Sequence, residues 1–294
     1  MLRITRVRQA LVVTGITSLV LASSLVAGAA TTTGSYNAAD AKLVPASFTK
    51  TTIQVATDAT YAPDESMSGT TMVGFDVDMM KAIAKTLGVK INENNVTFDS
   101  ILAGIDAGRY QIANSSFTDT KAREKQVYFV DYFQAGEAVY AKSSSSVKFS
   151  GLPSLCGLSV AVETGTTEQS DAVNTAKTCS ASKKLTVLAY PTQTSADLAV
   201  SSGRAKLGFL DSQVAGYVVS QSKGAFKLVG SAIEVAPYGI GTPKTAAGKG
   251  LATAIKAAVK TLIANGTYGA ILAKWGVSAG SLPTAKIVLD GATS

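Results

Sequence analysis

One pattern occurs twice in this chain and constrains its fold more than any other feature. In each half a helix-forming segment ends at a Gly-Arg pair, Gly108-Arg109 and Gly203-Arg204, and a short apolar run follows. A polar residue stands eight positions after each glycine, Ser116 in the first half and Asp211 in the second. Strands that alternate with helices at this pace predict two α/β lobes of related design, with polar residues at the carboxyl ends of parallel strands, where open sheets bind ligands. The alternative is a coincidental periodicity.

The stretch from Gln111 to Arg123 is the strongest candidate for a binding site. A short apolar run stops at Asn114-Ser115-Ser116, and Thr118-Asp119-Thr120 is suited to capping a helix whose first turn carries Arg123. Free backbone amides, a helix dipole and a guanidinium all attract a carboxylate. The stretch therefore predicts a site for a small anion. The alternative is an ordinary strand–turn–helix connection with a surface arginine.

Apolar periodicity predicts the remaining elements. We expect strands over 52–57, 90–98, 158–162, 184–189 and 207–210. We expect helices through Met79–Leu87 and Leu251–Ile263, a helix from Tyr268 to about Gly276, and short helices capped by Asp99 and Ser195. Extended runs near 139–143 and 233–241 would cross between the lobes, and we place the last helices on the first lobe. Lobe 1 then comprises residues 51–141 and 237–294 and lobe 2 residues 142–236, joined by a hinge of two crossings.

The N-terminus predicts export. Three arginines precede an uncharged apolar run from Ala10 to about Ala30, which ends in the small residues Ala27-Gly28-Ala29. This pattern is typical of a signal peptide, here residues 1–29, with cleavage near Ala29 and a periplasmic location. A retained membrane anchor is the alternative. Position 29 is not cysteine, which excludes a lipid anchor there, and residues 30–50 are expected to form a flexible leader.

Composition excludes several classes of function. The chain has no histidine, so Ser-His-Asp catalysis, Cys-His catalysis and histidine-containing metal sites are ruled out. We expect no metal and no cofactor, and Asp76 and Asp78 are better explained as helix-capping residues than as a metal pair. The net charge is +7, but the lysines are scattered, so nucleic acid is not an expected partner. Cys156 and Cys179 are expected to form a disulfide rather than remain free buried thiols.

Several motifs, in this order and spacing, resemble one family across about residues 52–293. The motifs are Ala-Thr-Asp58-Ala-Thr-Tyr61-Ala-Pro, Val-Gly-Phe-Asp-Val-Asp78, Ser115-Ser116-Phe-Thr118-Asp-Thr-x-x-Arg123, Gly165-Thr166-Thr167, the strand end at Asp211, and Asn-Gly-Thr-Tyr268 followed by Lys-Trp275-Gly. The chain resembles the extracytoplasmic solute-binding proteins of ABC importers, in the branch that binds polar amino acids (family 3). The resemblance implies a two-lobed type II periplasmic-binding-protein fold of the Venus-flytrap kind. It also implies a monomer that delivers an amino acid to an inner-membrane permease and is not an enzyme.

The resemblance assigns a role to each candidate residue. Arg123 would pair with the ligand carboxylate, and Asp211 would take the α-ammonium from the other lobe. The remaining positions that it implies are hydroxyl partners at Ser115, Ser116, Thr118 and Thr167, an aromatic wall at Tyr61 and a side-chain contact at Asp58. A zwitterion that bridges Arg123 and Asp211 would favour the closed state of the two lobes.

Three positions depart from the family pattern. Gln111 replaces a common aspartate, which we expect to alter local hydrogen bonds more than binding. Asp64 stands where an aromatic residue is frequent, and Glu163 where the residue is often apolar. Together with Asp58, these acids either favour a cationic or amide side chain of the ligand or point to solvent.

Two other functions are considered for this chain. An enzyme on the same scaffold, such as a cyclohexadienyl dehydratase, would use Asp58, Glu163 or Asp211 as acid or base. A ligand-sensing module is the other alternative. The run Ser180-Ala-Ser-Lys183 matches a serine-enzyme motif, but it lacks the accompanying motifs and is taken as chance.

Overall fold

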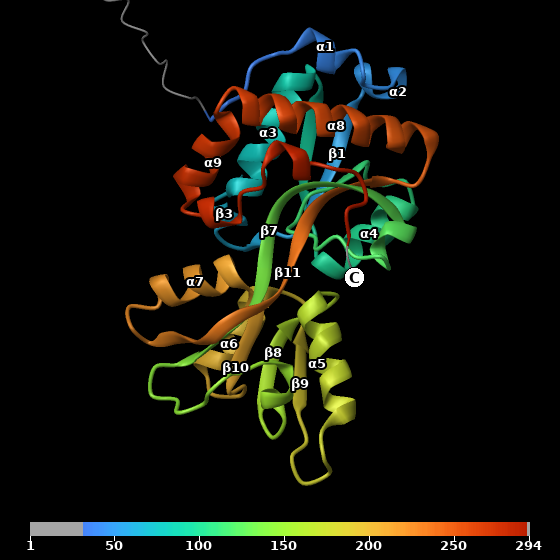
Figure 1. Cartoon of the computed structure of the whole chain (residues 1–294). Helices are drawn as coiled ribbons and strands as arrows, with labels where there is room; N and C mark the ends of the chain where they lie inside the picture. Colours follow the sequence, from blue (N-terminus) through green and yellow to red (C-terminus); the bar gives the residue numbers. More distant parts are fainter. Residues whose placement is uncertain (1–31, 293–294) are drawn as a thin grey trace, which may run out of the picture.

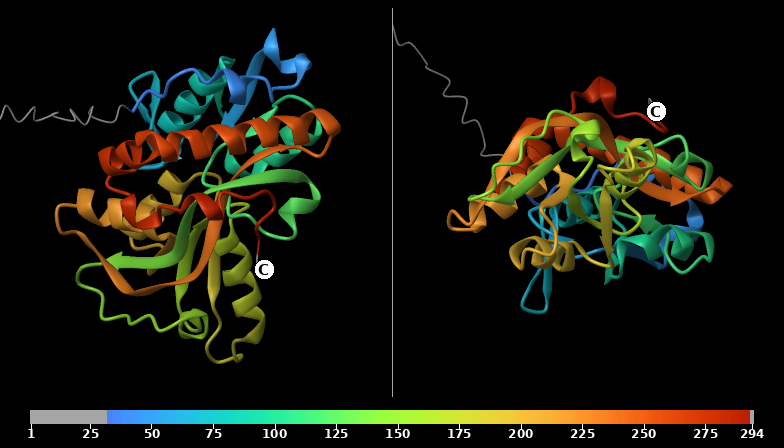
Figure 2. Two further views of the ribbon diagram at one scale, coloured as in Figure 1. Left: turned by 45° about the horizontal axis from the view of Figure 1, so that its top comes forward. Right: turned by 90° about the horizontal axis from the view of Figure 1, so that it is seen from below.

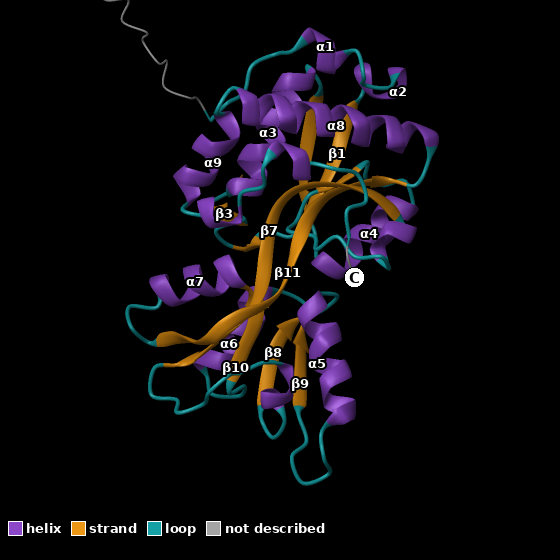
Figure 3. Ribbon diagram, viewed as in Figure 1, coloured by secondary structure: helices purple, strands orange, loops and turns teal. Residues whose placement is uncertain are grey.

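Two long strands run through the middle of the molecule and connect its two halves (Figures 1 and 3). The computed structural model describes residues 32–292. Strands β7 (Val127–Lys142) and β11 (Phe226–Pro243) pair antiparallel along almost their whole length. β11 pairs with β6 (Ile112–Ala113) on one side, and β7 pairs with β10 (Leu207–Asp211) on the other. All eight strands therefore form a single mixed sheet, in the order β5-β1-β6-β11-β7-β10-β8-β9.

Lobe 1 is built around three parallel strands and four helices. The strands are β1 (Thr52–Thr57), β5 (Lys90–Asn95) and β6, and the helices are α3 (Phe75–Leu87), α4 (Phe98–Asp106), α8 (Ala246–Ala264) and α9 (Thr267–Trp275). As expected, α8 and α9 pack on this lobe, where they contact α3 (Figure 2). The buried face of α3 carries Met79, Met80 and Ile83, and the helix ends at Gly88, whose φ of 68° is the left-handed geometry that glycine favours. A small sheet of β2 (Thr60–Tyr61), β3 (Glu65–Ser68) and β4 (Thr71–Val73) precedes α3.

Lobe 2 repeats this plan on the other side of the long strands. It contains β8 (Ser159–Glu163), β9 (Thr186–Tyr190) and β10, covered by α5 (Thr167–Thr178), α6 (Gln193–Ser201) and α7 (Ser212–Gln221). A disulfide joins Cys156 to Cys179 at the end of α5, which confirms the pairing expected from the sequence. The fold is thus the expected α/β architecture with two lobes.

Two predicted helix caps differ from the structure. Thr192, not Ser195, caps α6, because its hydroxyl oxygen accepts the amide hydrogen of Ser195 at 3.3 Å. Asp99 lies in the first turn of α4, where its carboxylate accepts a hydrogen bond from the hydroxyl of Thr97 at 2.7 Å. In both cases a threonine with extended backbone immediately before the helix takes the capping position.

Residues 35–50, expected to be a flexible leader, pack against lobe 1 instead. They form α1 (Ala38–Ala41) and α2 (Ala46–Thr49). The amide of Asn37 donates to the carbonyl of Thr86 at 2.9 Å, and the hydroxyl of Thr261 donates to Asp40 at 2.7 Å. Val44 is 7% exposed and joins the core of lobe 1, and Phe48 packs against the same core, so two apolar side chains and a few hydrogen bonds hold this segment on the lobe. The predicted signal peptide at 1–29 lies outside the described residues.

The two long strands change partners between the lobes. The register of β7 with β11 shifts between Ile233 and Ala236, opposite the stretch 135–137 of β7, and β7 begins to pair with β10 at Glu137. The sequence places the division at 141/142 and 236/237, and these lobe boundaries remain a prediction. Over residues 32–292 no helix combines the length and apolarity that a membrane span requires.

Candidate ligand-binding site between the lobes

All of the ligand-binding residues predicted from the sequence line one pocket between the lobes. They share this pocket with four residues that the prediction did not include: Glu65, Phe98, Thr166 and Glu168. The cavity has a volume of about 10 Å³, roughly the space of one water molecule, because side chains from the two lobes contact each other across it. Their arrangement shows which groups are already paired and which are not.

Three contacts connect the lobes at the pocket. The hydroxyl of Tyr61 donates to Asp211 Oδ2 at 2.9 Å and accepts the backbone amide of Asp211 at 3.0 Å. Arg123 Nη2 donates to the carbonyl of Gly165 at 2.9 Å. The hydroxyl oxygens of Thr118 and Thr167 lie 3.4 Å apart. The guanidinium, the strand-end aspartate and the two threonines thus line one pocket, although they come from opposite lobes.

The loop that carries Arg123 differs from its prediction. No regular helix follows Thr118–Thr120; Arg123 begins a single 3-10 turn, Arg123–Lys125, and β7 starts at Val127. A full helix therefore has no room at this loop, and the helix N-termini at the pocket belong to α4 and α5 instead, which begin at Phe98 and Thr167. Arg123 is positioned by other means: its Nη1 donates to the carbonyl of Thr118 at 2.9 Å, and its amide donates to the hydroxyl of Thr120 at 3.2 Å.

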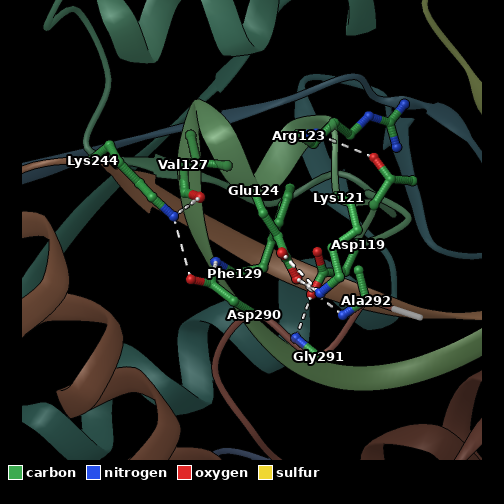
Figure 4. Close-up of polar contacts among 11 residues, drawn as sticks. Asp119, Lys121, Arg123, Glu124, Val127, Phe129, Lys244, Asp290, Gly291 and Ala292 are labelled. Carbon is green, nitrogen blue, oxygen red and sulfur yellow. Dashed lines mark hydrogen bonds and ion pairs between the residues drawn. The ribbon is translucent and has the colours of Figure 1, made fainter. Parts of the chain in front are cut away.

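The last residues of the described chain support this loop from behind (Figure 4). Asp119 accepts a hydrogen bond from the amide of Gly291 at 2.9 Å, and Glu124 accepts one from Ala292 at 3.1 Å. Asp290 accepts a hydrogen bond from the amide of Phe129 at 2.8 Å and lies 3.3 Å from Lys244 Nζ. The C-terminal segment therefore connects the Arg123 loop to the start of β7.

Aromatic rings cover one side of the guanidinium. The Arg123 carbon Cζ lies 5.5 Å from the centroid of the Phe98 ring and 5.2 Å from that of Phe117. Both distances suit a cation–π interaction. Phe98 stands at the N-terminus of α4 and also lines the pocket, so the pocket has an aromatic wall at Phe98 in addition to Tyr61.

The carboxyl groups contributed by lobe 1 are well supplied with donors. Asp58 accepts hydrogen bonds from the amide and hydroxyl of Thr60, at 3.0 and 2.7 Å, and from the amide of Phe98 at 2.9 Å. Glu65 accepts the hydroxyl of Ser115 at 2.9 Å and that of Ser116 at 3.3 Å. Asp58 thus holds the local backbone together, and most of its hydrogen-bonding capacity is already used.

Asp64 and Asp76 lie directly behind the pocket. Ser116 has a left-handed φ of 49°, which directs its amide to Asp76 Oδ2 at 2.9 Å and its hydroxyl to Asp64 Oδ2 at 3.0 Å. Tyr132 donates to the other oxygen of Asp76. Gln213 of lobe 2 donates to Asp64 Oδ2 at 2.6 Å. Asp64, expected to act on the ligand or to face solvent, is therefore fully buried in a contact between the lobes.

Three further residues singled out from the sequence have local roles. The side-chain oxygen of Gln111 accepts the amide of Gln54 at 3.0 Å, which is the local hydrogen bonding that we expected. Asp78 bonds to Lys274 and Trp275 of α9, at 2.6 and 2.8 Å, and does not cap α3, whose N-cap residue is Gly74. Among residues 32–292 no group of three or more histidine, cysteine, aspartate or glutamate side chains is arranged to hold a metal ion.

Lobe 2 contributes carboxyl groups that lack partners. Glu163 and Glu168 are 2% and 1% exposed, and one carboxyl oxygen of each has no hydrogen-bond partner. Burial and the neighbouring Asp58 raise the pKa of Glu163 to about 9. Burial and Asp211 raise the pKa of Glu168 well above its usual value. A cation brought close to these groups would stabilise their ionised form.

Glu168, Glu65 and Phe98 were missed for identifiable reasons. Glu168 follows Thr167 directly, in a segment whose polarity is typical of an exposed first helical turn. Glu65 lies beyond the Asp58–Pro63 loop and reaches the pocket only because the small sheet β2-β3-β4 folds back. Phe98 precedes the aspartate expected as a helix cap. The adjacency of Glu168 to Thr167 was the one signal present in the sequence.

Comparisons with known proteins agree with this geometry. Residues 53–278 match the bacterial extracellular solute-binding proteins, family 3. The arginine-binding protein ArgT of Corynebacterium glutamicum is 32% identical over 219 residues, which cover 74% of this chain and 71% of ArgT. An ancestral arginine-binding protein bound to arginine has a similar structure, with a TM-score of 0.71 and 32% identity over 77% of this chain and 99% of that one. A further structural neighbour is the ancestral amino acid-binding protein AncCDT-1, a precursor of cyclohexadienyl dehydratase, with a TM-score of 0.68 and 29% identity over 76% of this chain and 95% of that one.

The chain therefore belongs to the bacterial extracellular solute-binding proteins of family 3. Membership in a family of extracellular proteins makes it an exported protein. The function predicted from the sequence, capture of an amino acid between two lobes for import by an ABC transporter, is confirmed at this level.

Proposed function

We propose that this protein binds an amino acid with a cationic side chain, of the arginine or lysine type, and delivers it to the permease of an ABC importer. The observation that carries the proposal is the charge of the pocket. One guanidinium, Arg123, faces five carboxyl groups: Asp58, Glu65, Glu163, Glu168 and Asp211. A neutral zwitterion would pair with Arg123 and Asp211 and leave the glutamates without a cation. A second positive charge on the ligand gives these glutamates a cationic partner.

The geometry suggests one orientation of the ligand. The carboxylate pairs with Arg123, near the hydroxyls of Thr118 and Thr167, and the α-ammonium replaces the Tyr61 hydroxyl at Asp211. The side chain then extends toward Glu163, whose free oxygen accepts from a guanidinium or ammonium group. Phe98 offers its ring to the same cation.

Ligand binding breaks existing contacts between the lobes. The ligand has to replace the Thr118–Thr167 and Tyr61–Asp211 contacts with its own. Because its charged groups bond to both lobes, it favours the closed arrangement more than the open one. The arginine-binding names of the relatives support this ligand class.

Calorimetry with charge-matched ligand pairs tests the proposal. We expect arginine or lysine to bind with micromolar or tighter affinity. The neutral isosteres citrulline and norleucine should bind about 100-fold more weakly, since a desolvated charge pair contributes roughly 2–5 kcal/mol. Equal affinity for arginine and citrulline would show that the glutamates do not select a cation, and a flat response to all of these ligands would refute the site itself.

A dehydratase is the second candidate, because one observation suits it. Burial keeps the pKa of Glu163 at about 9, so this group holds a proton at neutral pH and has the form of a general acid. Binding without turnover is the better proposal, since the relatives compared above are named for binding. Incubation with small cyclic acids should give no product. Measurable turnover that Glu163→Gln abolishes would favour the enzyme.

The proposal extends to the state of the mature protein. We propose that it is a periplasmic monomer, released by signal cleavage near Ala29 without a lipid anchor. Mass spectrometry of the exported protein and light scattering in solution test these points. A mass that includes residues 1–29, or a dimer at micromolar concentration, would contradict them.

A further inference from the structure

A second hollow lies beside the enclosed pocket, on the side of the hinge strands. Its volume is about 640 Å³, and we call it the vestibule. Its walls come from the loop 118–123, the first half of α5, and the hinge segments of β7 and β11. Five residues line both the vestibule and the enclosed pocket: Thr118, Thr166, Thr167, Arg123 and Asp211. The two spaces are therefore separated only by side chains that meet across the lobes.

Glu137 of β7 lines the vestibule from its buried side. The residue is 4% exposed, and its Oε2 has no hydrogen-bond partner. In the sheet it lies opposite Asp211 of β10 and Ile233 of β11. A buried carboxyl oxygen without a donor is costly, so its retention here indicates that a donor arrives from elsewhere.

The charged groups around Glu137 are acidic, and the Thr167 side chain also faces it. Glu168 and Asp171 face it from α5, and Asp211 faces it from β10. Glu234 lines the same space from β11. Burial, followed by Glu168 and then Asp171, raises the pKa of Glu137 to about 10. All of the neighbouring charges that act on it are negative.

The one cation of the vestibule is already engaged. Arg123 donates to the carbonyls of Thr118 and Gly165. Among the described residues, no ion pair includes Glu137, Asp171 or Glu234. The polar groups of the vestibule therefore lack a positive partner, while the space is large enough for a small organic cation.

We propose that the vestibule is a second binding site, which holds one primary ammonium or guanidinium group against Glu137 and Asp171. Its role rests on the proposed function: it would hold a cationic solute beside Asp211 and Thr167 before that solute reaches the enclosed pocket. Carboxylate and hydroxyl acceptors fit either head group, and the acidic lining disfavours anions. The site concerns the head group alone and does not require an α-carboxylate.

A titration with n-butylammonium isolates this site. The protein is first saturated with L-arginine, so that the enclosed pocket is occupied, and amide signals are followed by ¹H–¹⁵N NMR. We expect saturable shifts confined to the signals around residues 137, 171 and 234, and none with n-butanol. Shifts spread over the surface without saturation, or equal shifts with butanol, would overturn the proposal.

Matched variants connect the response to the named groups. Glu137→Gln combined with Asp171→Asn should weaken butylammonium binding at least tenfold, while Asp106→Asn on the exposed side of α4 should leave it unchanged. If the double variant does not fold, Asp171→Asn alone, at a half-buried position, should still weaken binding severalfold. If the measured variant binds butylammonium as tightly as the wild type, the proposed vestibule site is wrong.

The pH dependence adds an independent readout. A bound cation requires Glu137 to lose its proton, so wild-type affinity for butylammonium should rise between pH 6 and pH 8.5, and Glu137→Gln should flatten this rise. Failure of arginine to bind in calorimetry would refute the proposed function alone. The same titration on the protein without arginine would then still decide whether the vestibule binds a cation.

Discussion

The two sides of the pocket present their carboxyl groups in different ways. On lobe 1, Asp76 accepts hydrogen bonds on both oxygens, from Tyr132 and from the amide of Ser116, and Glu65 accepts two serine hydroxyls. On lobe 2, Glu163 and Glu168 each have an oxygen without a partner. Both pairs are almost completely buried. The difference lies in the donors that the chain provides.

The acids of the two lobes therefore have different roles within one acidic site. Asp76 and Glu65 of lobe 1 shape the Ser115–Ser116 turn, and the partners of their oxygens are part of the fold. The free oxygens of lobe 2 gain a partner only when a donor comes between the lobes. Removing an acid from lobe 1 should therefore cost stability, whereas removing one from lobe 2 should cost binding.

The largest expected effect follows from removing the one cation. Arg123→Ala should weaken binding of arginine or lysine about thousandfold, because the ligand carboxylate loses a charge-assisted bidentate partner in a water-poor site. Lys121→Ala, two residues away and exposed, is the matched control and should bind as the wild type does. Calorimetry measures both. Wild-type affinity in Arg123→Ala would mean that the carboxylate binds elsewhere.

The next effect tests the structural role of lobe 1. Asp76→Ala leaves the amide of Ser116 and the hydroxyl of Tyr132 buried without an acceptor, which should lower the free energy of unfolding by about 3 kcal/mol. Asp78→Ala removes a more exposed ion pair with Lys274 and the hydrogen bond from Trp275, and should cost about 1 kcal/mol. Urea unfolding compares the two. Similar losses would show that Asp76 does not organise the turn.

Much of this site is predictable from sequence because its residues end strands. Asp58, Ser116 and Asp211 follow apolar strands, and parallel strands bring their carboxyl ends to one edge. The disulfide and the placement of α8 and α9 on lobe 1 also follow from local patterns and chain crossings. Family resemblance then supplies roles that spacing alone does not.

The remaining features depend on contacts between distant segments. The sequence around Glu168 is polar, and only the approach of lobe 2 to Asp211 and Arg123 makes that carboxyl group buried. The expected helix after Thr120 is cut short because β7 begins at Val127. Residues 35–50 look like a linker by composition, yet Val44 finds a place in the core of lobe 1. None of these outcomes follows from residues close in sequence.

A smaller effect is expected when an acid of lobe 2 is replaced. Glu163→Gln should weaken arginine binding about 30-fold, since a neutral amide replaces a charged acceptor worth roughly 2 kcal/mol. Citrulline should lose little affinity, and the free energy of unfolding should stay equal or rise, because a buried acid is removed. A loss of stability as large as that of Asp76→Ala would erase the distinction between the lobes.

The last effect is a pH dependence that has opposite signs with and without ligand. Burial and Asp58 raise the pKa of Glu163 from 4.5 to about 9, so the folded protein keeps a proton that the unfolded chain releases. This contribution to stability is complete below about pH 4.5 and is lost as the pH rises toward 9, so the free energy of unfolding without ligand should decline over that range. A bound cation favours the ionised carboxylate instead, and affinity for arginine should increase over the same range.

Calorimetry at pH 7 in two buffers of different ionisation enthalpy gives the number of protons released per bound arginine. Glu163→Gln should lower that number by about one, while Asp106→Asn should not change it. The experiment discriminates because an ordinary surface carboxylate is already ionised at pH 7 and releases nothing. Proton release that persists unchanged in Glu163→Gln would assign the titrating group to another buried acid, such as Glu168, Glu65 or Glu137.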